Sequence, residues 1–171
     1  ADLCNQAREI LSSSTFKIYT SDDIKGIELA GALKNIYAII SGYCHSLDVG
    51  ENAIGLILTR SMAEMSNFAV NKGANPITFL GLAGMGDLVA TCFSRLSRNY
   101  QFGWAIGEGL DIEAAKYKVG QVAEGLNTIR IIHNEISSSE IKMPLVSGMH
   151  EILFNSGSKE LLLEQIINSD I

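Results

Sequence analysis

The stretch from Gly26 to Ser41 constrains the fold more than any other part of the sequence, because it is apolar nearly all the way round a helix. Its apolar residues are Ile27, Leu29, Ala30, Leu33, Ile36, Tyr37, Ile39 and Ile40. A helix without a polar face has to be buried inside its protein. The pattern therefore predicts a central helix over 26–41, ended by Gly42.

Most of the remaining sequence also has helical periodicity, and only two prolines occur. We expect helices over 2–12, from Glu51 to Gly73, from Asn75-Pro76 onward, and over 87–94, 98–106, 112–118, 123–136, 145–154 and 159–168. One short strand is predicted, Phe16–Tyr19. Since a lone strand has no partner in a helical chain, we interpret it as the last strand of a preceding domain. The first residue, Ala1 rather than methionine, agrees with this interpretation. The expected fold class is all-α.

Composition excludes several classes of protein. The chain of 171 residues is 47% hydrophobic and 19% charged, which is typical of a globular domain. It contains neither the ~20 apolar residues of a membrane span nor the opening pattern of a signal peptide. The net charge is −6 and the 13 basic residues form no stripe, which argues against nucleic-acid binding.

The cysteines and histidines indicate no metal site. Cys4, Cys44 and Cys92 share no CxxC spacing, and their odd number favours free thiols in a reducing cytoplasm. The three histidines, at positions 45, 133 and 150, also lack a ligand spacing.

Lys34 is one of only two charged residues in the central helix, and the other, Glu28, points to a different face. On the residues alone, the simpler interpretation is a side chain that extends to water. The alternative is a catalytic cation that lines a cleft, next to the amide of Asn35.

A glycine-rich segment, Gly81 to Gly86, precedes Asp87. Its spacing, GxxGxG, is the reverse of the dinucleotide-binding fingerprint, so we reject it as a nucleotide loop. We expect a loop in which the glycines permit a tight turn and Asp87 acts as the N-cap of the next helix. Thr91 lies one turn later on the same face, so that the carboxylate and the hydroxyl could share a cleft.

Ser97-Arg98-Asn99 begins another predicted helix. A serine cap, free backbone N–H groups and an arginine at a helix N-terminus form a potential phosphate site. An ordinary cap beside a solvated arginine explains the residues equally well.

Taken in order, these motifs resemble the C-terminal half of the bacterial NAD(P)-dependent glycerol-3-phosphate dehydrogenases. The resemblance runs from about Ser21 to Gly125, and it rests on Gly26 to Asn35, Asn52 with Thr59-Arg60, Gly81 to Cys92, and Ser97-Arg98-Asn99. Met85 and Phe93 depart from the expected pattern without changing a functional group. Four separated motifs in the correct order are a specific signal.

The resemblance implies a role for each matching residue. Lys34 is expected to be the general acid/base. The substrate, glycerol 3-phosphate, is expected to contact Lys34, Asp87, Ser97, Arg98 and Asn99. We add Asn35 and Thr91 as substrate contacts because of their positions beside Lys34 and Asp87. The cofactor, NAD or NADP, is expected to contact Arg98, Val122 and Glu124.

The resemblance also implies the domain organisation. We expect residues 1–20 to end an upstream Rossmann domain that binds the nucleotide, and residues 21–171 to form a helical substrate domain like that of 6-phosphogluconate dehydrogenase. The implied enzyme is cytoplasmic, reduces dihydroxyacetone phosphate reversibly for phospholipid synthesis, and could form a homodimer. Two alternatives stay open: the helical domain of a related hydroxy-acid dehydrogenase, and a non-catalytic dimerisation module.

Overall fold

The computed structural model describes residues 2–120 and 123–168, and within these ranges it contains helices and no strand. The elements are α1 (Asp2–Leu11), α2 (Ile24–Ser46), α3 (Glu51–Asn71), α4 (Pro76–Leu80), the π-helical turn η1 (Leu82–Gly86), α5 (Asp87–Cys92), α6 (Arg98–Gly107), α7 (Ile112–Val119), α8 (Glu124–Ile136), α9 (Pro144–Phe154) and α10 (Lys159–Asn168). The predicted all-α class is confirmed.

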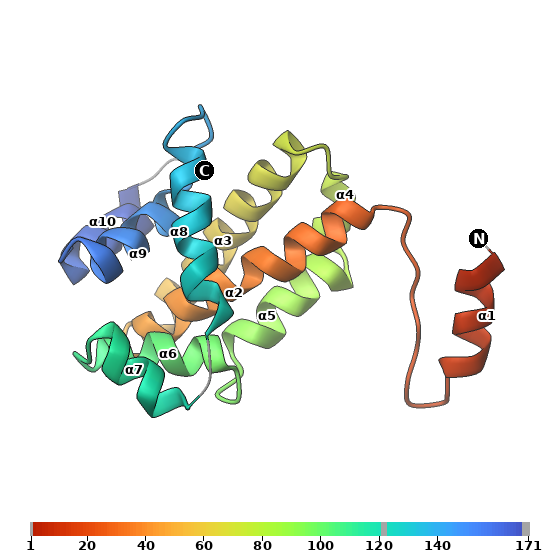
Figure 1. Ribbon diagram of the computed structural model, residues 1–171, viewed down its shortest axis with the longest axis horizontal. Coiled ribbons are helices and arrows are strands. Elements are labelled where there is room, and N and C mark those ends of the chain that lie inside the picture. The colour runs from red at the N-terminus through yellow and green to blue at the C-terminus, as the bar shows by residue number, and fades with distance from the viewer. Residues whose placement is uncertain (1, 121–122, 169–171) are drawn as a thin grey trace.

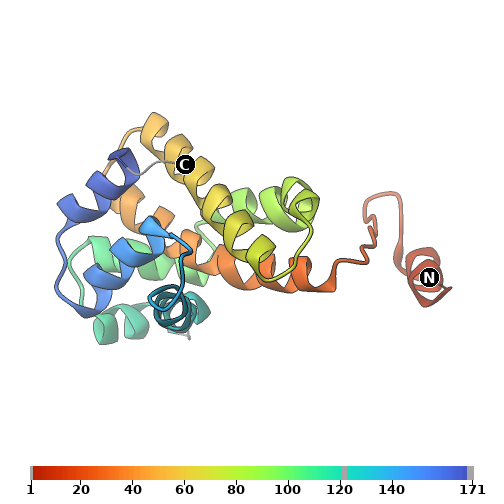
Figure 2. The ribbon, with the colours of Figure 1, turned by 90° about the horizontal axis from the view of Figure 1, so that it is seen from above.

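Helix α2 runs through the middle of the molecule, and α3, α5, α6 and α8 pack around it (Figures 1 and 2). Every residue from Ile36 to Cys44 is buried. The prediction of a central, buried helix is therefore confirmed, and its apolar residues join those of the surrounding helices in one core.

The predicted end of this helix at Gly42 is wrong, because α2 continues to Ser46. Gly42 instead lets two helices approach closely. A Cβ added at Gly42 would lie 2.0 Å from the carbonyl oxygen of Tyr100, and one added at Gly103 would lie 1.9 Å from that of Ile39. A single glycine inside a helix costs only about 1 kcal/mol, and the close contact between the α2 and α6 backbones offsets that cost.

The predicted strand over 16–19 does not form. The backbone N–H groups of Phe16 and Ile18 bond to the hydroxyls of Ser13 and Ser12, at 3.1 and 3.3 Å. Among the residues described, no second strand is available to pair with this segment, and a strand cannot satisfy its backbone alone. The segment therefore folds back on the serines that precede it.

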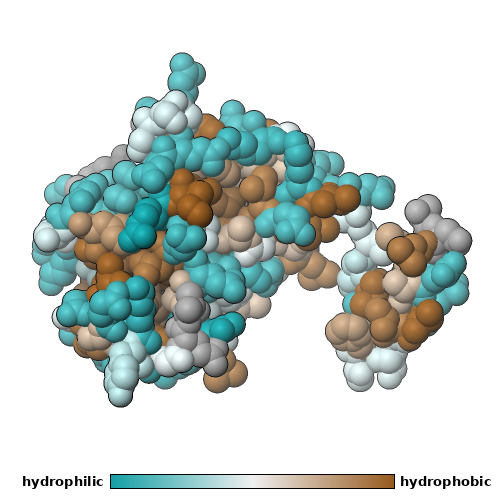
Figure 3. Space-filling model, viewed as in Figure 1, coloured by the Kyte–Doolittle hydropathy of each residue, from teal (hydrophilic) through white to brown (hydrophobic). Residues whose placement is uncertain are grey.

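Helix α1 and the segment that follows it lie apart from the other helices (Figure 1). Figure 3 shows apolar side chains exposed on this part of the molecule. They include Phe16, which is 58% exposed, and Tyr19, which is 75% exposed. The segment for which the sequence predicted a strand is therefore part of an exposed apolar surface.

No helix in the described ranges has both the length and the apolar character that a bilayer crossing requires. The three cysteines are free, as predicted: Cys4 is exposed, whereas Cys44 and Cys92 are buried. Burial raises the pKa of both buried thiols to about 12. They are therefore packed in the neutral thiol form.

Candidate functional site

Lys34 lies in the middle of α2, and its ammonium donates a hydrogen bond to Oδ2 of Asp87, the first residue of α5. The lysine side chain is 23% exposed and the aspartate side chain is 39% exposed. The interpretation of Lys34 as a cation that extends to open water is therefore wrong. A half-buried ammonium is costly without a counter-charge, and the carboxylate supplies one.

Asp87 does not cap a helix, which corrects the prediction. The π-helical turn η1 runs directly into α5, and no side chain caps the junction. Because the backbone is already helical before Asp87, its carboxylate is available for Lys34. The hydroxyl of Thr91 donates to the Asp87 carbonyl oxygen at 2.6 Å and lies 3.4 Å from Asp87 Oδ1. Thr91 thus shares a face with Asp87, as predicted.

A second set of contacts joins α2, α6 and α8 next to this ion pair. Asn99 donates from Nδ2 to Oδ1 of Asn35 at 3.0 Å, and its own Oδ1 accepts the backbone N–H of Gly125 at 2.9 Å. A Cβ on Gly125 would lie 2.5 Å from the Asn35 carbonyl oxygen, so that only glycine fits here. Asn99 is 9% exposed, and its amide fixes where α8 begins relative to α2.

The structure places the remaining predicted site residues as follows. Ser97 caps α6 as predicted, and its hydroxyl accepts the Tyr100 N–H at 3.4 Å. Arg98 is the first residue of α6 and is exposed. Glu124, exposed, is the first residue of α8, while Val122 lies outside the described residues. The roles of these residues in binding phosphate or cofactor stay predictions.

A shallow groove of about 440 Å³ runs between α2 and α8. Its lining residues are Ile27, Glu28, Gly31, Ala32, Asn35, Glu124 and Thr128. Gly31 leaves open space, since a Cβ there would meet nothing within 4 Å. The groove lies on the same part of α2 as Lys34 and has two carboxylates in its wall, which suits ligand groups that donate hydrogen bonds.

Sequence reasoning missed Glu28 and Thr128 as lining residues of this groove. A signal for them exists: Glu28 and Asn35 are two helical turns apart, and Glu124 and Thr128 are one turn apart, so each pair lies on one helix face. What the sequence could not show is that these two faces meet.

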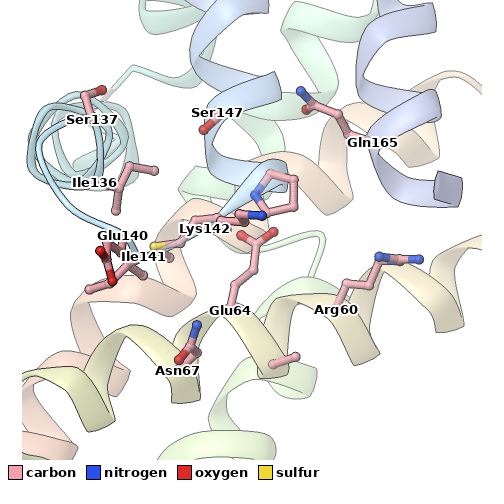
Figure 4. Close-up of a pocket in the computed structure, with 13 residues that line it drawn as sticks. Arg60, Glu64, Asn67, Ile136, Ser137, Glu140, Ile141, Lys142, Ser147 and Gln165 are labelled. Carbon is pink, nitrogen blue, oxygen red and sulfur yellow. The ribbon is translucent and has the colours of Figure 1, made fainter. Parts of the chain in front are cut away.

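A larger cavity of about 1050 Å³ lies between α3, the start of α9 and α10, and none of the predicted site residues lines it (Figure 4). Glu64 of α3 points toward the first residues of α9, where its carboxylate accepts the Leu145 N–H at 2.7 Å. The same carboxylate accepts the hydroxyl of Tyr37, in α2, at 3.1 Å. Burial raises the pKa of Glu64 to about 7. Because these contacts tie helices together, we assign this region to the scaffold.

Comparisons with known proteins identify one family. Residues 23–164 match the family described as NAD-dependent glycerol-3-phosphate dehydrogenase C-terminus. A protein of Pseudomonas syringae pv. tomato, named glycerol-3-phosphate dehydrogenase (NAD(P)+), is 48% identical over 169 residues, which is 99% of this chain and 50% of the relative. The chain spans about half the length of the curated relatives that it matches.

Solved structures agree with these matches. A crystal structure of glycerol-3-phosphate dehydrogenase from Coxiella burnetii superposes with a TM-score of 0.91 at 36% identity, over 98% of this chain and 52% of the other. The yeast glycerol-3-phosphate dehydrogenase superposes with a TM-score of 0.86 at 26% identity, over 96% and 48%.

Proposed function

The chain belongs to the family of NAD-dependent glycerol-3-phosphate dehydrogenases, as their C-terminal domain, and from this premise we propose that it is the substrate-binding half of an enzyme that reversibly reduces dihydroxyacetone phosphate to glycerol 3-phosphate. The observation that carries the proposal is the Lys34–Asp87 ion pair, which lies next to the Asn35–Asn99 contact on α2. The product would supply phospholipid synthesis.

Lys34 is the proposed general acid. During reduction, negative charge develops on the carbonyl oxygen of the substrate, and an ammonium in a half-dry site both stabilises that charge and donates the proton. Asp87 holds the ammonium in place, and Thr91 fixes the backbone turn from which Asp87 projects. In the reverse direction, neutral Lys34 accepts the proton from the secondary hydroxyl.

The phosphate of the substrate is assigned to the start of α6. Arg98 supplies a guanidinium. The first backbone N–H groups of α6 point out of its N-terminus, which is the positive end of the helix dipole. Ser97 and Asn99 flank the arginine. With the net charge of the chain at −6, an anion needs such a local positive group. The binding energy of the phosphate then positions the reacting carbon.

The groove between α2 and α8 fits part of a dinucleotide. Its carboxylates, Glu28 and Glu124, accept O–H and N–H groups, and they would repel the pyrophosphate. We therefore assign the ribose or carboxamide end of NAD or NADP to this groove. Val122 and Arg98 stay predicted cofactor contacts. The nicotinamide supplies the hydride.

The proposed partner of this domain is a Rossmann domain that precedes it in the enzyme. We assign residues 1–20 to that domain and 21–171 to the substrate domain. Two observations support the division: the family match begins at residue 23, and α1 exposes Leu3, Ile10 and Leu11. We place the enzyme in the cytoplasm. A homodimer is compatible with this arrangement, and sedimentation of the full-length enzyme would detect it.

The proposal is tested by joining this chain to the Rossmann half and following NADH and NADPH oxidation. We expect turnover with dihydroxyacetone phosphate, and turnover at least about 100-fold lower with 2-keto acids such as pyruvate, because a site that binds phosphate discriminates strongly against a substrate without it. Preference for the keto acid would assign the domain to a hydroxy-acid dehydrogenase. Turnover with neither substrate would favour a non-catalytic module.

A further inference from the structure

The contact between α8 and α9 brings together two histidines that are well separated in sequence. The rings of His133 and His150 stack with centroids 3.7 Å apart and planes inclined by 6°. Both side chains are partly buried. The sequence indicated no ligand spacing among the histidines, since this proximity arises only when the two helices pack.

Glu151 adds a carboxylate to the histidine pair. One donor atom from each of His133, His150 and Glu151 lies within 4.8 Å of the other two, and His150 Nδ1 is 3.8 Å from Glu151 Oε1. Ligand atoms about 2.0–2.2 Å from a tetrahedral Zn²⁺ ion are about 3.4 Å apart. Donor atoms as far as 4.8 Å apart therefore have to approach one another by up to roughly 1.4 Å. The two parallel rings also have to turn about their Cβ–Cγ bonds.

The existing hydrogen bonds leave this cluster available for a ligand. The Nδ1 atom of His150 is buried and has no hydrogen-bond partner among the described residues. A buried polar atom without a partner is uncommon and calls for an explanation. Asn155 donates to Glu151 Oε1 at 3.0 Å and so orients the carboxylate, as the supporting residues around metal ligands do.

Glu151 and Arg130 are the charged groups that act on His150. Burial lowers the pKa of His150, and the neighbouring His133 and Arg130 lower it further, while Glu151 acts in the opposite direction. The Arg130 guanidinium lies over the Phe154 ring, 4.5 Å from its centroid.

We propose that His133, His150 and Glu151 form a binding site for a divalent transition-metal ion of the Zn²⁺ type, with water completing the coordination. Two imidazoles and one carboxylate are a ligand set that such ions prefer over Mg²⁺ or Ca²⁺. The ion would link α8 to α9 and stabilise the folded chain. This site is separate from the groove and from Lys34, and it does not depend on the proposed reaction.

The test uses the full chain with Cys4→Ser, because the exposed thiol of Cys4 is an alternative metal ligand. Co²⁺ is titrated and the visible ligand-field absorption is followed, Zn²⁺ is then added in competition, and thermal unfolding is recorded with and without Zn²⁺. We expect one equivalent of Co²⁺ to bind, Zn²⁺ to displace it, Zn²⁺ to raise Tm, and Mg²⁺ to have no effect.

Variants identify the ligands. His133→Ala, His150→Gln and Glu151→Gln should each weaken Co²⁺ binding by at least about 10-fold, with far-UV circular dichroism showing that the helices persist. His45→Ala is the matched control, because the His45 ring contacts Ser41 and Phe93 on another part of the molecule. Absence of Co²⁺ absorption, or equal affinity in the variants and the control, would overturn the proposal.

Discussion

At the scale of single residues, the candidate site depends on side chains that are distant in sequence and paired in space. Lys34 and Asp87 are 53 positions apart, and Asn35 and Asn99 are 64 positions apart. Each pair joins α2 to the first turn of another helix, which is α5 for Asp87 and α6 for Asn99. A substitution at one of these residues should therefore affect turnover or binding more than it affects folding. For Lys34 this holds when the substitution removes the half-buried ammonium itself.

Lys34→Met in the full-length enzyme should lower kcat by about 10²–10⁴-fold, since it removes both the proton donor and the cation. Met retains most of the apolar stem, so Tm should change little. Steady-state kinetics with dihydroxyacetone phosphate measure the effect. Lys116→Met is the control, because Lys116 forms an exposed ion pair with Glu113. A near-normal kcat in Lys34→Met would show that another group supplies the proton.

Arg98→Ala should act mainly on binding. The loss of one charge-assisted contact to a phosphate costs roughly 1.5–3 kcal/mol, so KM for dihydroxyacetone phosphate should rise about 10- to 100-fold with a smaller change in kcat. Arg95→Ala, at a nearby exposed position, should leave KM unchanged. Equal KM values for the two variants would show that the phosphate does not bind at the start of α6.

At the scale of secondary-structure elements, two kinds of contact hold the site's helices in place. The first is the close approach of α2 and α6 at Gly42 and Gly103, which sets the position of the α6 start relative to Asn35. The second is Glu64, which joins α3 to α2 through Tyr37 and to the first turn of α9 through Leu145. Neither contact lies in the groove between α2 and α8.

Gly103→Ala should destabilise the chain by about 1–3 kcal/mol or more, because the new methyl group overlaps the backbone of α2. Gly55→Ala on the exposed face of α3 has open space and should stabilise by roughly 0.5–1 kcal/mol. Urea unfolding of both variants measures the difference. Equal stability of the two variants would contradict the close helix crossing.

Glu64 should make stability fall as the pH rises from about 4.5 toward 7. Burial raises the pKa of this carboxyl from 4.5 to about 7 in the folded chain. Between these values the folded state holds a proton that the unfolded state has released, so unfolding becomes easier with increasing pH. The loss amounts to about 3 kcal/mol once the pH exceeds the folded pKa.

The variant Glu64→Gln isolates this contribution, because it keeps a hydrogen-bonding group of the same size without the titration. Urea unfolding at several pH values from 4.5 to 8 should show a weaker pH dependence for the variant than for the original chain. Parallel curves for the two proteins would mean that Glu64 titrates normally.

At the scale of the whole molecule, the helical body has its own continuous core, whereas α1 and residues 12–22 expose apolar side chains on a separate part of the structure. Ile77, Leu80 and Leu82 add exposed apolar groups around α4 and η1. Surfaces of this kind mark places where another domain or chain packs.

The 171-residue chain assayed alone should therefore fold but neither turn over dihydroxyacetone phosphate nor bind NADH tightly. The phosphates of a dinucleotide need a glycine-rich turn between a strand and a helix, and here Leu82–Gly86 form a π-helical turn instead. NADH fluorescence titration and a turnover assay check this. Tight binding or measurable turnover would mean that the chain contains a complete nucleotide site.

The sequence by itself determined the fold class, the position of most helices and the motifs of the family, because helical periodicity, caps such as Ser97 and Asn75, and glycines such as Gly73 act within a few residues. It could not determine contacts that depend on how helices pack. The predicted break at Gly42, the strand over 16–19 and the cap at Asp87 were wrong for this reason. Local propensity favoured each of them, but helix packing decided otherwise at Gly42 and Asp87, and at residues 16–19 the described part of the chain offers no strand to pair with.

Only the tertiary structure decided three contacts: the Lys34 ammonium pairs with the Asp87 carboxylate, Asn99 joins α2 to α8, and the His133 ring stacks on that of His150. These outcomes depend on the crossing of α2 and α6 and on the packing of α8 against α9. The sequence of a helix determines which side chains share a face. The packing of the whole core determines which face of another helix they contact.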